Sequence, residues 1–153
     1  MKKIIEEYIT LLSPTEKMNT PIQINYDDGE DGVNSVEINL IYNGVLYQGK
    51  GRDYLWVDAF ADLQNKLPHN IKLACCMTCR HGNMCPYGNK ENQLFCTRDI
   101  IIASKDDIVD LIDNSDSFVK RAVSSNKYCD RFVYQSDDYY TYNDYLYYLE
   151  RKQ

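Results

Sequence analysis

The residues of this chain that are best suited to chemistry are its cysteines. Five of the six cysteines and one of the two histidines fall between Leu73 and Arg98. Thiolate and imidazole groups at this density are typical ligands of a metal ion, and zinc takes four of them in a tetrahedron. The segment is therefore predicted to hold a cysteine-ligated metal, with a role that is structural rather than catalytic.

The spacing of the cysteines suggests which of them are ligands. Cys76-x-x-Cys79 presents two thiolates from one tight turn, so a second pair must come from elsewhere. Cys96 precedes an apolar run and Cys129 lies well downstream. Both stand at edges of expected elements, where a ligand is held in a fixed position. We predict a zinc site at Cys76, Cys79, Cys96 and Cys129, with Cys85, Cys75 and His81 as alternates.

The motif around these cysteines resembles an uncharacterised bacterial family of small proteins. In that family C-x-x-C is followed by Gly-Asn and Pro-x-Gly, and then by further cysteines. The residues of this chain that carry the resemblance are Cys76, Cys79, Gly82, Asn83, Pro86 and Gly88. The resemblance covers at most residues 55 to 148. It favours a metal site and implies no activity.

Three other interpretations of the cysteines stay open. An iron–sulfur cluster could use Cys76, Cys79, Cys85 and Cys96, although the spacing matches neither common ferredoxin pattern. Cys76 and Cys79 could form a redox pair, which needs a helix N-terminus to stabilise the thiolate, whereas the glycines and proline beyond Cys79 indicate a loop. The thiols could also be small buried hydrophobic groups with no metal.

The sequence offers little support for an enzyme. A cysteine–histidine nucleophile needs a third, orienting group and an oxyanion hole, and no motif supplies either. No Gly-rich phosphate loop, G-x-S-x-G or H-E-x-x-H occurs. We therefore expect a non-catalytic protein-interaction module, with an iron–sulfur or C-x-x-C redox protein as the alternative.

Length and charge limit the possible partners and location. A chain of 153 residues fits one domain, 1–153, with a first portion over 1–68 and a cysteine-rich, helical portion over 69–153. The net charge of −6 argues against a nucleic-acid partner. The first 25 residues contain neither a signal peptide nor a membrane span, so a cytoplasmic protein without membrane contact is expected. Arg80, Lys90 and Arg98 make the cysteine segment locally positive, as suits nearby thiolates.

Periodicity predicts the elements of the first portion. Residues 2–12 have apolar side chains at helical spacing and are predicted as an amphipathic helix that ends at Ser13-Pro14. Strands are predicted over 22–26, 36–42 and 45–50, the last two joined by a type I′ turn at Asn43-Gly44. A helix follows over 54–67, capped by Asp53.

The expected order, helix, three strands, helix, resembles a double-stranded-RNA-binding domain over residues 1–68. The segment GKGRDYLWVDAFADLQ is similar to the last strand and second helix of that family. The family's phosphate-binding lysines are replaced here by Asp53, Tyr54 and Asp58, so the resemblance implies the fold without RNA binding. The predicted fold class is α+β: a three-stranded antiparallel sheet with flanking helices (α-β-β-β-α), then the cysteine-rich metal-binding segment and C-terminal helices.

The last third is predicted to be mostly helical. A short strand is expected over 99–103, a helix over 105–113, a brief helix over 118–123 and a terminal helix from about 143. Half of the 14 tyrosines occur in the last 20 residues. Because tyrosine buries a large ring and keeps a polar hydroxyl, this region could contact a protein partner or a second copy of the chain.

Overall fold

The computed structural model describes residues 2–29, 32–52, 56–87, 93–113 and 117–151. The chain divides into two compact units, which are described separately. Unit 1 comprises Met1–Leu73 and Asp144–Gln153, and unit 2 comprises Ala74–Asn143. The chain thus leaves unit 1, forms the whole of unit 2, and then returns to unit 1.

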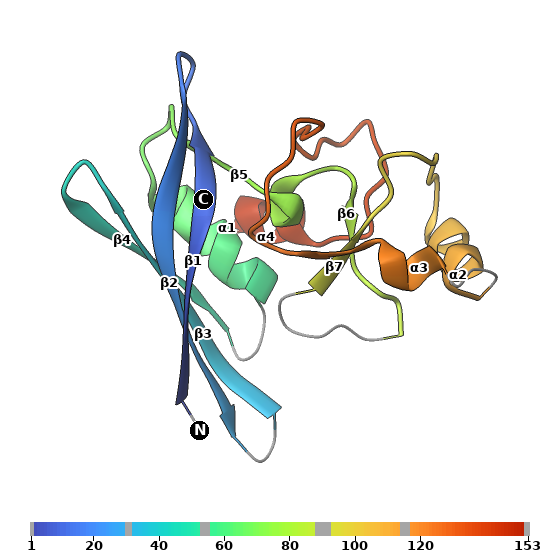
Figure 1. The fold of residues 1–153 in the computed structure, drawn as a ribbon, viewed down its shortest axis with the longest axis horizontal. Coiled ribbons are helices and arrows are strands. Elements are labelled where there is room, and N and C mark those ends of the chain that lie inside the picture. The colour runs from blue at the N-terminus through green and yellow to red at the C-terminus, as the bar shows by residue number, and fades with distance from the viewer. Residues whose placement is uncertain (1, 30–31, 53–55, 88–92, 114–116, 152–153) are drawn as a thin grey trace. The chain divides into compact units, whose positions relative to one another are not determined.

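Unit 1 is built on a curled sheet (Figure 1). Four successive strands pair antiparallel: β1 (Lys2–Leu12), β2 (Lys17–Gly29), β3 (Gly32–Tyr42) and β4 (Val45–Gly51). The short strand β5 (Lys72–Ala74) lies beside β1, so the order is β4-β3-β2-β1-β5. The predicted three-stranded α-β-β-β-α fold is therefore wrong, because unit 1 has a five-stranded sheet and unit 2 has a second sheet of its own.

The error begins at residues 2–12, which form strand β1 and not a helix. Ser13 and Pro14 make a hairpin turn: the Ser13 amide donates to the Glu16 carbonyl at 3.0 Å, and the Glu16 amide donates to Ser13 Oγ at 3.1 Å. Long antiparallel pairing with β2 then satisfies the backbone of β1. Two residues assigned to the buried face of the supposed helix, Ile4 and Tyr8, are 64% and 61% exposed.

The hairpin between β3 and β4 agrees with its prediction. Asn43 and Gly44 have φ angles of 50° and 76°, as a type I′ turn requires. Tyr42 pairs with Val45, Leu40 with Tyr47 and Ile38 with Gly49, which is the predicted register. Val36, Ile38 and Leu40 of β3 are buried, while Glu37 and Asn39 stay partly exposed and Ile41 is exposed on the opposite face.

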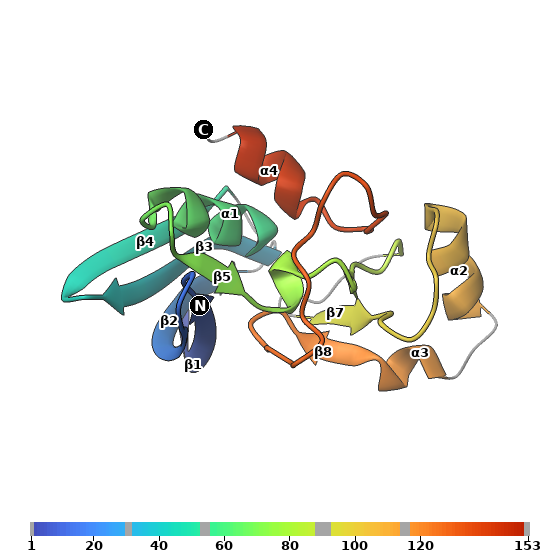
Figure 2. The same cartoon turned by 90° about the horizontal axis from the view of Figure 1, so that it is seen from above.

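Helix α1 (Trp56–Lys66) covers the buried face of this sheet, and α4 (Tyr145–Arg151) packs against α1 (Figure 2). Both helices were predicted. Asn65 fixes their contact by donating from Nδ2 to the Leu149 carbonyl at 2.9 Å. The proposed cap Asp53 and the neighbouring Tyr54 lie outside the described residues.

Side chains of α1 also close the outer edge of the sheet. Strand β4 is an edge strand, and such strands invite pairing with other chains. Here Asp62 accepts from the Lys50 amide at 2.8 Å, Asp58 accepts from the Arg52 amide at 2.7 Å, and Lys66 Nζ donates to the Gln48 carbonyl at 2.8 Å. Side chains of α1 therefore occupy backbone hydrogen-bonding groups of β4 from Gln48 onwards.

Gly49 allows α1 to approach the sheet closely. A Cβ at this position would lie 2.3 Å from the Ala59 carbonyl oxygen and 2.6 Å from Leu63 Cβ. We expect Gly49→Ala to lower the free energy of unfolding of unit 1 by about 3 kcal/mol, because overpacking against backbone forces the helix outward. Gly44→Ala is the control, since a Cβ there meets nothing within 4 Å and costs only the strain of its positive φ, about 1 kcal/mol. Urea denaturation followed by Trp56 fluorescence measures both, and equal losses would contradict the packing argument.

Unit 2 is built on shorter elements. A 3₁₀ turn, η1 (Cys76–Thr78), is followed by strands β6 (Gly82–Asn83), β7 (Gln93–Cys96) and β8 (Ala122–Ser124), which form a sheet in the order β6-β7-β8. Figure 2 shows β7 beside β8. Helices α2 (Lys105–Asp113) and α3 (Ser117–Lys120) lie between β7 and β8 in sequence. Helix α2 has the predicted bounds. The brief helix predicted over 118–123 is only partly present, because its second half is β8.

The strand predicted over 99–103 does not form. These residues have no regular secondary structure, and Ile101 is 90% exposed while Ile102 is buried. The segment instead leads into α2, where the Asp107 carboxylate accepts from the Ala103 amide at 2.8 Å. Among the helices of the described residues, none combines the length and hydrophobicity needed to span a membrane.

Candidate metal centre

The C-x-x-C motif of unit 2 forms a compact knuckle. The backbone turns over η1, so that the Cys79 amide donates to the Cys76 carbonyl at 3.3 Å. The chain then turns again, and the Gly82 amide donates to the Cys79 carbonyl at 3.1 Å. The His81 amide points at the Cys79 sulfur, 3.5 Å away. Backbone N–H groups directed at a cysteine sulfur favour its thiolate form, as a metal ligand requires.

Strand pairing places Cys96 beside this knuckle. In the β6–β7 pair Gly82 lies opposite Cys96, so the last residue of β7 faces the backbone that follows Cys79. The Thr97 amide continues the contact by donating to the His81 carbonyl at 3.0 Å. Cys96 was chosen because it precedes the strand predicted over 99–103, which does not form; it is instead the last residue of β7, a strand that was not predicted.

Two backbone segments on either side of Cys129 bind the knuckle from the other direction. Before it, the carbonyls of Ser125 and Lys127 accept from the amides of Met77 and Cys76 at 2.9 and 2.8 Å. After it, the carbonyl of Val133 accepts from the Arg80 amide at 2.8 Å, and Tyr134 forms a bridge with Cys79. Cys129 lies between two segments that are both attached to the C-x-x-C turn.

These three segments surround one depression of about 550 Å³, called here the thiol pocket. Its lining includes Cys76, Cys96 and Cys129. Burial raises the pKa of Cys76 strongly, and the nearby Cys75, Cys79, Cys96 and Cys129 raise it further. Burial also raises the pKa of Cys79, with additional contributions from Cys96 and Cys129. Cys76 and Cys79 thus each lie within electrostatic reach of Cys96 and Cys129.

The thiols lie near one another but are not arranged to coordinate a metal ion. Within the described part of the chain, no group of three or more histidine, cysteine, aspartate or glutamate side chains is arranged to hold a metal ion. Tetrahedral zinc needs four sulfurs at about 2.3 Å. The thiols would have to move closer together around an ion to meet that requirement.

The three alternate ligands occupy different surroundings. Cys75 is fully buried, which raises its pKa to about 12, and its sulfur lies 3.9 Å from Thr78 Oγ1. Cys85 is not among the residues that line the thiol pocket and lies near Tyr87. The His81 ring packs edge-on against Tyr139, with 5.6 Å between centroids, and burial lowers its pKa. None of the three lines the thiol pocket; of the four primary residues, Cys79 does not line it either.

Sequence reasoning missed most of the cations around the thiols. The thiol pocket is lined by five of them, namely Arg98, Lys120, Arg121, Lys127 and Arg131. Only Arg98 was singled out from the sequence. The sequence analysis also named Arg80 and Lys90. Arg80 packs over the Tyr139 ring at 4.6 Å, and Lys90 lies outside the described residues. The remaining four were recognisable only as neighbours of Cys129 or of the segment before β8.

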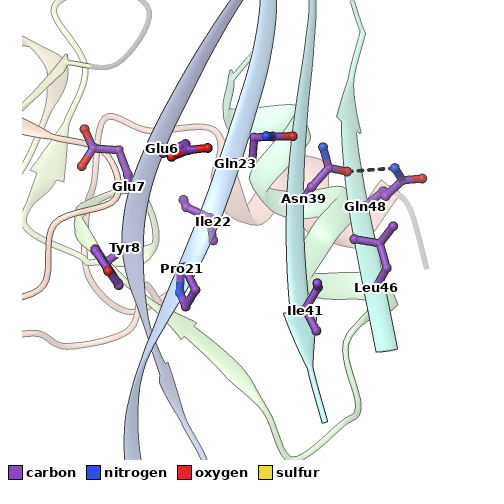
Figure 3. Close-up of a pocket in the computed structure, with 10 residues that line it drawn as sticks. All are labelled: Glu6, Glu7, Tyr8, Pro21, Ile22, Gln23, Asn39, Ile41, Leu46 and Gln48. Carbon is purple, nitrogen blue, oxygen red and sulfur yellow. Dashed lines mark hydrogen bonds between the residues drawn. The ribbon is translucent and has the colours of Figure 1, made fainter. Parts of the chain in front are cut away.

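Unit 1 carries a different kind of depression, of about 750 Å³, on the exposed face of its sheet (Figure 3). A row of polar side chains crosses four strands there: Glu6, Gln23, Asn39 and Gln48. Gln48 Nε2 donates to Asn39 Oδ1 at 2.8 Å. Tyr8, Pro21, Ile41 and Leu46 form an apolar row beside it. Three of the four side chains in the polar row are amides, which are neither nucleophiles nor acid–base groups at neutral pH.

Comparison with known proteins adds no family to this description. Neither the protein-family models nor the curated proteins include one that matches the sequence. The function must therefore be argued from the arrangement of the thiols and of the side chains around them.

Proposed function

We propose that this protein is a non-catalytic protein-binding module, in which a structural zinc ion on Cys76, Cys79, Cys96 and Cys129 holds unit 2 together. The observation that carries the proposal is the convergence of three separate segments on one pocket, which Cys76, Cys96 and Cys129 line, with Cys79 within electrostatic reach of Cys96 and Cys129. Four sulfur donors are a soft ligand set, which selects zinc or an iron–sulfur centre over magnesium or calcium.

The build of unit 2 supports a structural role for the ion. Its strands contain two, four and three residues, and residues 125–143 contain no helix and no named strand. Small folds with little regular structure usually need a disulfide or a metal to reach adequate stability. A zinc ion at the thiol pocket would join the knuckle, the end of β7 and the segment around Cys129.

Protein binding is proposed as the activity because the site lacks a catalytic constellation and the surface carries exposed aromatic side chains. Tyr134 in unit 2 is 38% exposed, and Tyr147 in unit 1 is 56% exposed. Tyrosine is enriched at protein interfaces because its ring buries a large area and its hydroxyl still finds a polar partner.

The alternative with the same donor set is a redox protein that holds an iron–sulfur cluster. The four thiols suit either centre, since both are held by four thiolates. A C-x-x-C redox pair without a metal is less well supported, because burial raises the pKa of both Cys76 and Cys79, whereas a reactive pair needs a lowered one.

Metal analysis of protein purified without chelator tests the proposal. We expect one zinc per chain and a colourless protein, and a chelator that removes the zinc should lower the melting temperature of unit 2. A brown protein with iron and sulfide would establish the cluster instead. Protein that contains no metal, and that gains no stability from added zinc, would contradict both.

A further inference from the structure

We propose that the thiol pocket also docks an acidic segment of a protein partner. This inference deepens the proposed function, on which it rests, by naming the chemistry of the partner. Its basis is the distribution of charge in unit 2. Residues 74–143 contain eight Lys and Arg and ten Asp and Glu, yet five of those eight cations and only one acid, Asp99, line the thiol pocket.

Two of the five cations have structural partners. Arg121 forms a two-pronged ion pair with Asp99, at 2.5 and 3.0 Å, and also donates to the Cys96 carbonyl at 3.2 Å. Arg98 Nη1 lies 3.8 Å from the Cys129 sulfur. These two contacts position the segments that carry the cysteines, so they explain why Arg98 and Arg121 are present.

The other three cations, Lys120, Lys127 and Arg131, are exposed at the pocket. Zinc bound by four thiolates carries a formal charge of about −2. Together with Asp99 this offsets three of the five cations, which leaves a positive surplus of about two charges. Neutralising the zinc–thiolate centre therefore does not require all five cations of the thiol pocket. The remaining positive charge is available to an anionic ligand.

The lining favours carboxylates of a peptide over nucleic acid. Single-stranded nucleic acids bind through aromatic side chains that stack on bases, and none of the described residues that line the thiol pocket is aromatic. Arg131 can pair a carboxylate through two parallel hydrogen bonds. Ala122 and Val123 supply apolar surface for the methylene groups of glutamate.

The test is binding of a fluorescein-labelled octaglutamate peptide to the zinc-loaded full chain, followed by fluorescence anisotropy. We expect saturable binding that weakens as salt is raised. The double variant Lys127→Glu/Arg131→Glu should weaken it at least tenfold. The control, Lys17→Glu/Lys72→Glu, makes the same change in net charge on exposed residues of unit 1 and should change affinity less than twofold.

Zinc content and melting temperature measured on the same samples separate the two proposals. A normal zinc content with no peptide binding, or with equal loss in both double variants, would overturn the docking site and leave the zinc centre intact. Tighter binding of an oligothymidylate of equal charge would also overturn it, in favour of nucleic acid. Peptide binding that is lost in Lys127→Glu/Arg131→Glu but kept in the control variant, by a protein that never contains zinc, would support the docking site and refute the proposed function.

Discussion

Cys76→Ser or Cys129→Ser is expected to abolish zinc binding and to unfold unit 2 while unit 1 stays folded. A hydroxyl is a poor zinc ligand, and zinc-finger peptides gain about 10 to 16 kcal/mol from their ion at neutral pH. Loss of one of four ligands should therefore remove most of the energy that joins the knuckle to the Cys129 segment. Zinc per chain and calorimetric unfolding measure the effect.

The two units can be followed independently in this experiment. The only tryptophan of the chain, Trp56, is buried in α1 of unit 1, so its fluorescence reports that unit. Cys85→Ser is the matched control, because Cys85 is partly exposed and does not line the thiol pocket. Cys75 would be a poor control, since serine at this fully buried position adds a buried hydroxyl. Equal destabilisation by the Cys85 and Cys76 variants would show that the ligand assignment is wrong.

Gly82→Ala is expected to have the second largest effect. A Cβ at this position would lie 2.0 Å from the Cys76 carbonyl oxygen, and backbone on both sides leaves no side chain to move aside. Strand β6 must then separate from the knuckle. Because Gly82 pairs with Cys96, that separation carries Cys96 away from Cys79. We expect loss of zinc and a decrease of more than about 3 kcal/mol in the free energy of unfolding of unit 2.

Two measurements check the Gly82 prediction. Titration with a colorimetric zinc chelator should release the ion from the variant at lower chelator concentration than from the wild type. Trp56 fluorescence should show unit 1 unfolding at an unchanged urea concentration, which serves as the internal control. A variant that retains zinc as tightly as the wild type would mean that the close approach of β6 to η1 is not needed for the site.

The parts of unit 1 that were predictable are those where local chemistry allows one structure. Asn43-Gly44 accepts the positive φ of a type I′ turn, and that turn fixes the register of β3 and β4. Residues 2–12 lack such a signal. Their apolar positions fit a helix, but β-branched Ile4, Ile5 and Ile9 also suit a strand, and pairing with β2 decides between the two. A partner strand is a tertiary feature that periodicity does not report.

Some residues of the candidate site could likewise be predicted from local sequence, and others could not. Cys76 and Cys79 were identified by spacing, and Cys96 and Cys129 by their places at element edges. Strands β6, β7 and β8 were missed, because segments of two to four residues are too short for alternation to be visible. Lys120, Lys127 and Arg131 become neighbours only when β8 and the following turn bring them to one pocket. Their shared surface depends on the fold and has no signature in the linear sequence.

The path of the chain through its two units sets an order for its synthesis. Helix α4 belongs to unit 1 but follows all of unit 2 in the sequence. On the ribosome, every residue of unit 2, including all six cysteines, emerges before α4 can dock on α1. The α1 surface beneath α4 therefore stays uncovered until the whole of unit 2 has been synthesised.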